Sequence, residues 1–344
     1  MSRRHRPSCP PAGPAMSLLF KLIRLGLVLG ALGVAMLAIL ALFGFAVPEL
    51  DLLNHAQIFL LPGTLLGLVI VAVLLRGTLR SVAVIVVLVG LAASANVMLP
   101  EFIGSQQARP TAPASGTVTM MTHNLFGMNY EMEKVIAAIR AEDPDIIVLQ
   151  EYFGEQATDL HPLLLADYPF FVRCRGGKRA NLGLYSRLPF AQVDDGACPN
   201  NAYGTTRTAH ILADFQTEDG KTFSVITTHM DWPIPVARQH EQLDALSEVV
   251  DKIEGPMILA GDFNSTPWSY SLRDFVARNG FTRETVNLVT YPLSWFYFGA
   301  WRDTIPFLPL DHVMTRGGVV VHDLHAGQKT ASDHLPVVFT FSVE

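Results

Sequence analysis

Three long apolar runs near the N-terminus constrain this chain more than any other feature. Residues 25–47, 56–75 and 81–99 contain no Asp, Glu, Lys or Arg. Each run has the length of about 20 residues that a helix needs to cross a bilayer. A cleaved signal peptide would account for the first run, because the GFA sequence before Val47 resembles a cleavage site, but not for the other two. We therefore predict three transmembrane helices within residues 25–99.

Basic residues predict how these helices are oriented. The loop after the first helix contains no Lys or Arg, whereas the loop before the third helix contains Arg76 and Arg80. The N-terminal tail, residues 1–24, contains five basic residues: Arg3, Arg4, Arg6, Lys21 and Arg24. Because cytoplasmic loops carry the excess of Lys and Arg, the tail is predicted to be cytoplasmic. Three crossings of a bacterial inner membrane then place the rest of the chain on the extracytoplasmic side.

The rest of the chain reads as a linker followed by an acidic domain. Residues 100–116 are rich in Pro, Ala, Ser and Gly, which favours a linker. Residues 117–344 carry 17 of the 25 Lys and Arg residues and 28 of the 31 Asp and Glu residues, a net charge of −11. Such a charge disfavours non-specific binding to nucleic acid, which requires phosphate neutralisation. Cys174 and Cys198 both lie here, where an oxidising compartment would allow a disulfide; Cys9 lies in the tail.

The acidic domain alternates strand and helix patterns. Helices are predicted at residues 130–145 and 235–253. Strands are predicted at residues 117–125, 146–151, 182–189, 207–230 (as a pair), 256–264, 310–327 and 334–343. Many strands with two long helices indicate two sheets packed together, with helices on their outer faces.

Polar side chains recur where these apolar strands end. They are His123, Asn124, Gln150, Glu151, His229, Asp262, Asn264, Asp311, Asp333 and His334. Any one of these residues alone would be ordinary at a turn, where polar side chains bond to nearby backbone. Six polar strand ends together indicate a ligand site. Carboxylate and amide oxygens without cysteine suit Mg²⁺ or Mn²⁺, and a His beside an Asp suits proton transfer. The set therefore predicts metal-assisted hydrolysis of a phosphate ester, whereas a Ser-His-Asp hydrolase would be expected to carry a GxSxG motif, which is absent.

The ordered motifs HN, LQE, TTH, GDFN, LDHV and SDHLPV closely resemble the endonuclease/exonuclease/phosphatase superfamily over residues 117–344. That superfamily includes deoxyribonucleases, apurinic/apyrimidinic endonucleases, inositol-polyphosphate phosphatases and neutral sphingomyelinases. The resemblance implies a four-layer αββα sandwich after the three transmembrane helices. It also implies a membrane-anchored, Mg²⁺- or Mn²⁺-dependent phosphoesterase, in which water attacks a phosphodiester or phosphomonoester in line.

The resemblance also implies a metal site. Glu151 of LQE would be the principal ligand of the ion. Asn124 would help directly or through water, and Asp333 would lie near the ion.

The same resemblance implies roles for five catalytic residues. His334 would contact the scissile phosphate and Asp311 would orient it. Asp262 would position or deprotonate the attacking water. Asn264 would bond to a phosphate oxygen and hold that Asp, and His229 would stabilise charge on a phosphate oxygen.

The substrate stays open at this point. Arg179 and Arg207 are candidate phosphate contacts, although Arg179 would equally suit a solvated loop. The aromatic stretch at residues 291–301 would touch a lipid surface or hydrophobic substrate if exposed, but we favour its burial in the core. A lipid headgroup, a nucleotide, extracytoplasmic DNA and a sugar phosphate all remain candidates. The alternative, a non-catalytic membrane receptor or scaffold, fits poorly because the metal and His groups are all present.

Overall fold

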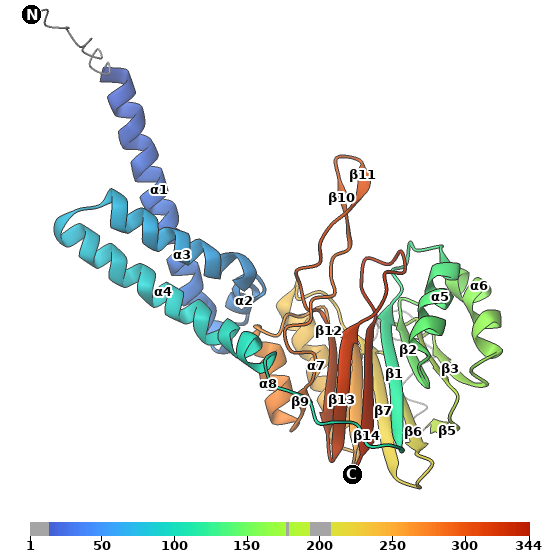
Figure 1. The fold of residues 1–344 in the computed structure, drawn as a ribbon. Helices are drawn as coiled ribbons and strands as arrows, with labels where there is room; N and C mark the ends of the chain where they lie inside the picture. Colours follow the sequence, from blue (N-terminus) through green and yellow to red (C-terminus); the bar gives the residue numbers. More distant parts are fainter. Residues whose placement is uncertain (1–13, 177–178, 193–207) are drawn as a thin grey trace, which may run out of the picture. The chain divides into compact units, whose positions relative to one another are not determined.

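The computed structural model describes residues 14–176, 179–192 and 208–344, and the chain forms two compact units (Figure 1). The helical unit comprises residues up to Phe43 together with Ala56–Val97. The catalytic unit, as we call the other, comprises Gly44–His55 and Met98–Glu344.

The helical unit contains the apolar runs. Its helices are α1 (Pro14–Ala41), α3 (Gln57–Leu74) and the first part of α4 (Gly77–Gly104). Three helices are long and apolar enough to cross a membrane, as predicted. Small residues let them approach closely, because a Cβ on Gly90 would lie 2.8 Å from the Cα of Ala35. Helix α4 continues to Gly104, inside the segment predicted as a linker.

Two six-stranded mixed sheets form the centre of the catalytic unit. The first has the order β13-β14-β1-β2-β4-β3 and the second β5-β6-β7-β8-β12-β9. The strands of the first sheet are β1 (Thr117–Asn124), β2 (Ile146–Gln150), β3 (Phe170–Cys174), β4 (Leu182–Ser186), β13 (Val319–Ala326) and β14 (Val337–Val343). Those of the second are β5 (Phe190–Gln192), β6 (His210–Gln216), β7 (Thr222–His229), β8 (Met257–Asp262), β9 (Thr282–Arg283) and β12 (Asp311–Arg316).

Helices cover the outer face of each sheet. Helices α5 (Met132–Glu142) and α6 (Gly154–Leu165) pack on the first sheet, and α7 (Val236–Val250) and α8 (Tyr270–Arg278) on the second. A third buried cluster, which includes Ile146, Ile211 and Ile258, joins the two inner faces. The predicted αββα sandwich is confirmed. Helices α6 and α8 were not predicted, because α6 contains Pro162 and α8 has only 9 residues.

The register of the second sheet brings three predicted site residues side by side. His229 lies opposite Asp262 in the parallel β7–β8 pair, and Asp311 lies opposite Asp262 in the antiparallel β8–β12 pair. The preceding residue must be glycine, because a Cβ on Gly261 would lie 2.1 Å from the carbonyl oxygen of Thr228. In the GDFN motif, packing therefore requires Gly261, and Asp262, a predicted site residue, follows it directly.

A hairpin stands outside both sheets. Its strands are β10 (Ser294–Tyr297) and β11 (Ala300–Asp303), which among the described strands pair only with each other (Figure 1). The burial expected for this aromatic stretch is wrong, because Trp295, Phe296 and Phe298 are exposed. Within the part of the chain that the structure describes, the hairpin joins neither six-stranded sheet, so these side chains are not part of a sheet core.

The short segment between α1 and α3 belongs to the catalytic unit. It contains two 3₁₀ turns, Leu42–Phe45 and Pro48–Asp51, and the short helix α2 (Leu52–His55). We call residues 44–55 the docked loop, because hydrogen bonds join it to α8 and the residues before it. The backbone N–H groups of Tyr270 and Ser271 donate to the two carboxylate oxygens of Asp51 at 2.6 and 3.0 Å.

Candidate active site

Asp262 is the centre of the site. Its carboxylate is buried and accepts hydrogen bonds from the Asn124 side chain at 2.9 Å and from the backbone N–H of Asn264 at 2.8 Å. Burial raises the pKa of Asp262 to about 7, against the lowering effect of the charged His334. A carboxyl that titrates near neutral pH suits a group that takes a proton from water.

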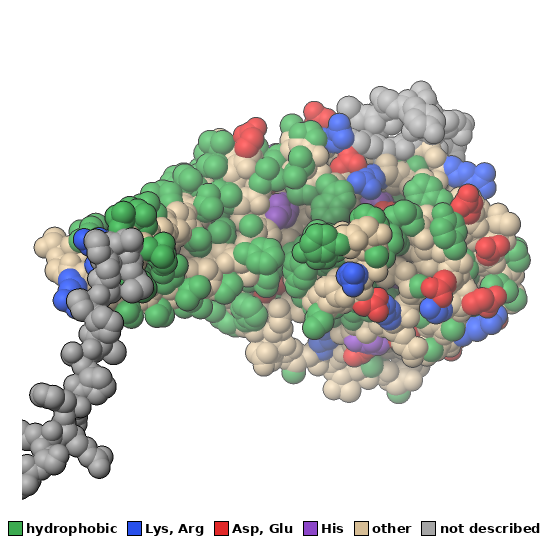
Figure 2. All heavy atoms as spheres, turned by 90° about the horizontal axis from the view of Figure 1, so that it is seen from above, with side chains coloured by type: hydrophobic (Ala, Val, Ile, Leu, Met, Phe, Trp, Pro, Cys, Tyr) green, Lys and Arg blue, Asp and Glu red, His purple; other side chains and the backbone are tan. Residues whose placement is uncertain are grey.

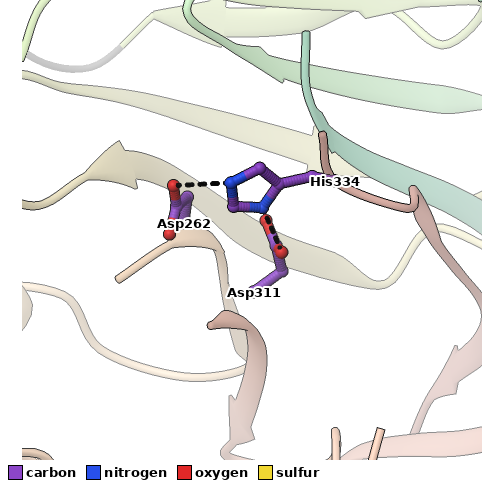
Figure 3. A group of neighbouring side chains, drawn as sticks. All are labelled: Asp262, Asp311 and His334. Atoms are coloured by element: carbon purple, nitrogen blue, oxygen red, sulfur yellow. Dashed lines mark hydrogen bonds and ion pairs between the residues drawn. The ribbon is translucent and has the colours of Figure 1, made fainter. Parts of the chain in front are cut away.

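His334 lies between two buried carboxylates (Figure 3). Its Nδ1 is 2.8 Å from Asp311, and its Nε2 is 3.8 Å from Asp262. Burial alone would lower the pKa of His334, but Asp311 and Asp262 raise it to about 10. Burial likewise tends to raise the pKa of Asp311, yet His334 outweighs it and the pKa is lowered. The pair therefore holds a charged imidazole whose Nε2 faces Asp262.

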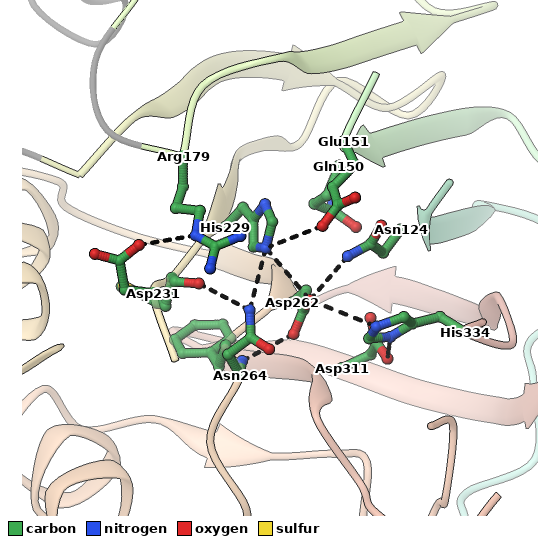
Figure 4. Close-up of polar contacts among 12 residues, drawn as sticks. Asn124, Gln150, Glu151, Arg179, His229, Asp231, Asp262, Asn264, Asp311 and His334 are labelled. Atoms are coloured by element: carbon green, nitrogen blue, oxygen red, sulfur yellow. Dashed lines mark hydrogen bonds and ion pairs between the residues drawn. The ribbon is translucent and has the colours of Figure 1, made fainter. Parts of the chain in front are cut away.

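His229 and Asn264 form the other side of the site (Figure 4). The Nε2 of His229 is 3.5 Å from Asp262 and 3.1 Å from the amide nitrogen of Asn264. That amide also donates to the carbonyl oxygen of Met230 at 2.9 Å. Burial, together with Arg179, lowers the pKa of His229 to about 3, so this ring is neutral. The side-chain nitrogen of Asn264 thus holds His229. The contact of Asn264 with a phosphate oxygen stays a prediction.

Glu151 and Asp333 place two more carboxylates at the site. Glu151, which has a φ of 54°, accepts from the backbone N–H of Gly127 at 2.6 Å and lies 3.9 Å from His229. Burial raises the pKa of Asp333 to about 6, and the carboxylate of Glu151 adds to the increase. The two acids are therefore close enough to repel each other.

This gathering of carboxylates fits a hard divalent cation. The oxygens of Glu151, Asp333 and Asn124 are the donor types that Mg²⁺ and Mn²⁺ prefer, and a cation would relieve the repulsion between the acids. By distance alone, Asp262, Asp311 and His334 also form a group with ligand atoms within 4.8 Å of one another. His334 is a poor ligand there, because Asp311 binds one ring nitrogen and the ring is charged.

A cavity of about 990 Å³ opens onto this site. Glu151, His229 and Arg179 line it together with apolar residues such as Phe126 and Phe153. The Nε of Arg179 donates to Asp231 at 2.8 Å, which holds the guanidinium at the cavity wall. Arg207, the other predicted phosphate contact, lies outside the described residues.

Tyr291 is a site residue that the motifs did not identify. Its ring lies over that of His334, with centroids 4.7 Å apart. Burial raises the pKa of Tyr291 to about 12, with Asp333 adding to the increase. Only its position shortly before LDHV in the sequence could have suggested a role.

Curated relatives match part of this region. A UPF0294 protein from Vibrio campbellii (strain ATCC BAA-1116) is 29% identical over 134 residues, which cover 39% of this chain and 44% of that protein. A UPF0294 protein from Vibrio cholerae serotype O1 (strain ATCC 39315 / El Tor Inaba N16961) is 31% identical over 134 residues, or 38% and 44% of the two chains. The chain thus matches less than half the length of these relatives.

Solved structures share the fold of the catalytic unit. An endonuclease/exonuclease/phosphatase family protein from Bacteroides thetaiotaomicron has a TM-score of 0.51 and 20% identity, covering 66% of this chain and 98% of its own. A similar protein from Beutenbergia cavernae DSM 12333 has a TM-score of 0.50 and 21% identity, covering 67% and 72%. TDP2 from D. rerio, solved with a single strand DNA product, has a TM-score of 0.50 and 15% identity, covering 67% and 100%.

The model of the Endonuclease/Exonuclease/phosphatase family matches residues 121–334, from the middle of β1 to His334. Members of this family are phosphoesterases or nucleases. The match contains the site residues described above and the strands of both sheets, except β14 and the first half of β1. The chain therefore belongs to the Endonuclease/Exonuclease/phosphatase family.

Proposed function

We propose that the chain is a membrane-anchored, divalent-metal-dependent phosphoesterase whose catalytic unit lies on the extracytoplasmic side of the inner membrane. It hydrolyses a phosphodiester or phosphomonoester by in-line attack of water. The observation that carries this proposal is the charged His334, which lies between Asp311 and Asp262 at the end of the second sheet.

The proposed chemistry divides the work between Asp262 and His334. Asp262 orients the attacking water and accepts its proton, which suits a carboxyl with a pKa near neutral. His334 donates through Nε2 to a phosphoryl oxygen as negative charge develops there. Asp311 fixes the imidazole tautomer by accepting from Nδ1.

Glu151, Asn124 and Asp333 would hold Mg²⁺ or Mn²⁺. When bound, the ion supplies Lewis-acid polarisation of the phosphate and neutralises charge. The chain's own contribution is to present these oxygens from three separate strand ends and loops. His229 and Arg179 face the cavity and are positioned to bind phosphate oxygens; Arg207 is proposed for the same role from its sequence position.

Three observations support the extracytoplasmic location. The tail and the loop between the second and third helices carry the basic residues, which favours a cytoplasmic side for both. The docked loop follows the first helix and is hydrogen-bonded to the catalytic unit, so both must lie on one side of the membrane. Cys174 is disulfide-bonded, as expected in an oxidising compartment; its partner lies outside the described residues.

The decisive experiment assays the full chain in lipid nanodiscs against a phosphomonoester, a phosphodiester, phospholipids and DNA, each with Mg²⁺, Mn²⁺ or EDTA. We expect hydrolysis of at least one ester that EDTA abolishes and Asp262→Asn lowers steeply. The exposed His325→Gln on β13 serves as the matched control and retains activity. Turnover that persists undiminished in EDTA, or no turnover of any ester, would refute the proposal.

The membrane topology needs its own test. An alkaline phosphatase fused after Gly116 should be active, because that enzyme folds only outside the cytoplasm. Activity of a cytoplasmic reporter at the same position would show that one helix does not cross.

A further inference from the structure

The hairpin β10–β11 carries aromatic side chains that the proposed chemistry does not use. Trp295, Phe296 and Tyr297 are 52%, 55% and 56% exposed, and Phe298 is 84% exposed. The turn residues Phe298 and Gly299 both have positive φ, as a type I′ two-residue hairpin turn requires, so Phe298 lies at the tip. An uncovered aromatic surface of this kind marks a contact site.

The base of this hairpin is fixed to the candidate active site. The backbone N–H of Leu293 donates to the carbonyl oxygen of Asp333 at 2.8 Å, beside His334. On the other strand, the ring of Trp301 lies 5.3 Å from that of Phe126, which lines the cavity. The hairpin therefore stands at the mouth of the cavity.

The surroundings of the hairpin have the composition of a membrane-interface surface. Arg302 is exposed on β11 opposite Trp295, and Lys329 lies 3.1 Å from Asp303. Met128, which lines the cavity, is also exposed. Figure 2 shows hydrophobic side chains gathered on this end of the catalytic unit among basic and acidic ones. Trp and Tyr rings beside basic residues favour the headgroup level of a bilayer.

We infer that the β10–β11 hairpin docks into the bilayer interface, and that the substrate is a phosphate ester in a lipid headgroup. The substrate part rests on the proposed function. A bilayer suits this surface better than a protein partner, because the chain's own three apolar helices keep a bilayer within reach. Rings at the headgroup level would bring the cavity mouth to the depth at which lipid phosphates lie.

The docking is directly measurable because residues 1–116 contain no Trp. All four Trp residues, Trp232, Trp268, Trp295 and Trp301, lie in the catalytic unit. We expect the full chain in nanodiscs of brominated phosphatidylcholine to fluoresce less than in unbrominated nanodiscs. The double variant Trp295→Phe/Trp301→Phe keeps the apolar surface but removes the reporters, so the quenching should be lost. Equal fluorescence of the wild type in both lipids would overturn the docking.

The substrate class is tested by a ratio of two activities in nanodiscs of phosphatidylcholine and phosphatidylglycerol. We measure phosphate-ester cleavage of these lipids and of soluble bis-p-nitrophenyl phosphate. Trp295→Ser/Phe298→Ser should lower the lipid-to-soluble ratio about tenfold, the effect of losing about 1.4 kcal/mol of aromatic insertion. The control Phe170→Ser, on edge strand β3, alters an exposed aromatic residue outside the hairpin and should keep the ratio.

The outcomes separate this inference from the proposed function. Soluble-ester turnover without lipid turnover, or an unchanged ratio in the hairpin variant, would overturn the lipid headgroup as substrate. Quenching without turnover of either substrate, or of any ester in the nanodisc screen, would instead refute the phosphoesterase, while the docking surface stands.

Discussion

Two Asp–His pairs of the catalytic unit, Asp51 with His55 and Asp311 with His334, differ in the charge of the histidine ring. In the docked loop, Asp51 is bound by the backbone N–H groups of Tyr270 and Ser271, and burial lowers the pKa of His55 to about 4. At the site, Asp311 instead accepts directly from His334, whose pKa is raised to about 10. One carboxylate caps a helix beside a neutral ring, and the other keeps a ring charged.

The difference is made by what each carboxylate contacts. Asp51 meets the first two N–H groups of α8, where a helix N-terminus favours negative charge, while Ser269 accepts from the next N–H, that of Leu272. His55 then accepts from the backbone N–H of Thr266 through Nδ1, which requires a neutral ring. In this chain, helix amides use the oxygens of Asp51, whereas an oxygen of Asp311 accepts from His334.

The largest effect should come from breaking the functional pair. His334→Ala and Asp311→Ala should each lower kcat by about two or more orders of magnitude, because a positioned proton donor is lost. Groups that act as one unit are non-additive, so the double variant should be little worse than His334→Ala. The measurement is kcat for both single variants and the double, on the ester that the nanodisc screen identifies. Multiplicative losses in folded protein would mean that the two residues act separately.

Removing a carboxylate from the proposed metal site should have the next largest effect. Glu151→Gln keeps the size of the side chain but not its charge, so divalent-metal affinity should fall and kcat should drop by about 10²-fold at limiting Mg²⁺. Raising Mg²⁺ should restore part of the activity. The matched control is Glu155→Gln, a cavity-lining residue without a proposed ligand role. An unchanged Mg²⁺ dependence in Glu151→Gln would remove this residue from the site.

The fold and the functional pair could be predicted from sequence for physical reasons. Apolar strands ending in Asp262 and Asp311 give a regular pattern, and their side chains meet because neighbouring strands set the register. The docked loop could not be found in this way. Asp51 and His55 contact residues more than 200 positions away, and no periodic pattern records such a contact.

The hairpin was mispredicted for a related reason. Composition identifies aromatic residues, but the partner surface decides whether they are buried. Of the strands that the structure describes, those containing Trp295 and Trp301 pair only with each other, so hydrophobicity alone gave the wrong answer.

A smaller effect, on stability rather than turnover, is expected at the docked loop. Asp51→Ala leaves two N–H groups of α8 without their acceptor, which should cost about 1–2 kcal/mol. The thermal unfolding midpoint of the full chain in nanodiscs, followed by Trp fluorescence, should fall by about 2–4 °C per kcal/mol. Glu49→Ala, an exposed acid in the same loop, is the control and should unfold like the wild type. If both variants unfold alike, the capping by Asp51 contributes nothing measurable.

An effect of similar size, seen only on acidification, is the pH dependence of stability that comes from the neutral ring of His55. Because folding lowers the pKa of His55 from 6.5 to about 4, the unfolded chain binds more protons between these values. The stability from His55 is therefore complete above pH 6.5 and is lost as the pH falls toward 4. At pH 5 this loss amounts to about 2 kcal/mol for one such group.

The variant His55→Gln does not titrate at this position, so its thermal unfolding midpoint should fall less than that of the wild type between pH 7 and pH 5. The buried residues His123, His229 and His312 also have a lowered pKa, but they are common to the wild type and the variant. Midpoints that fall in parallel would show that His55 is already charged when folded, and the contrast between the two Asp–His pairs would then be wrong.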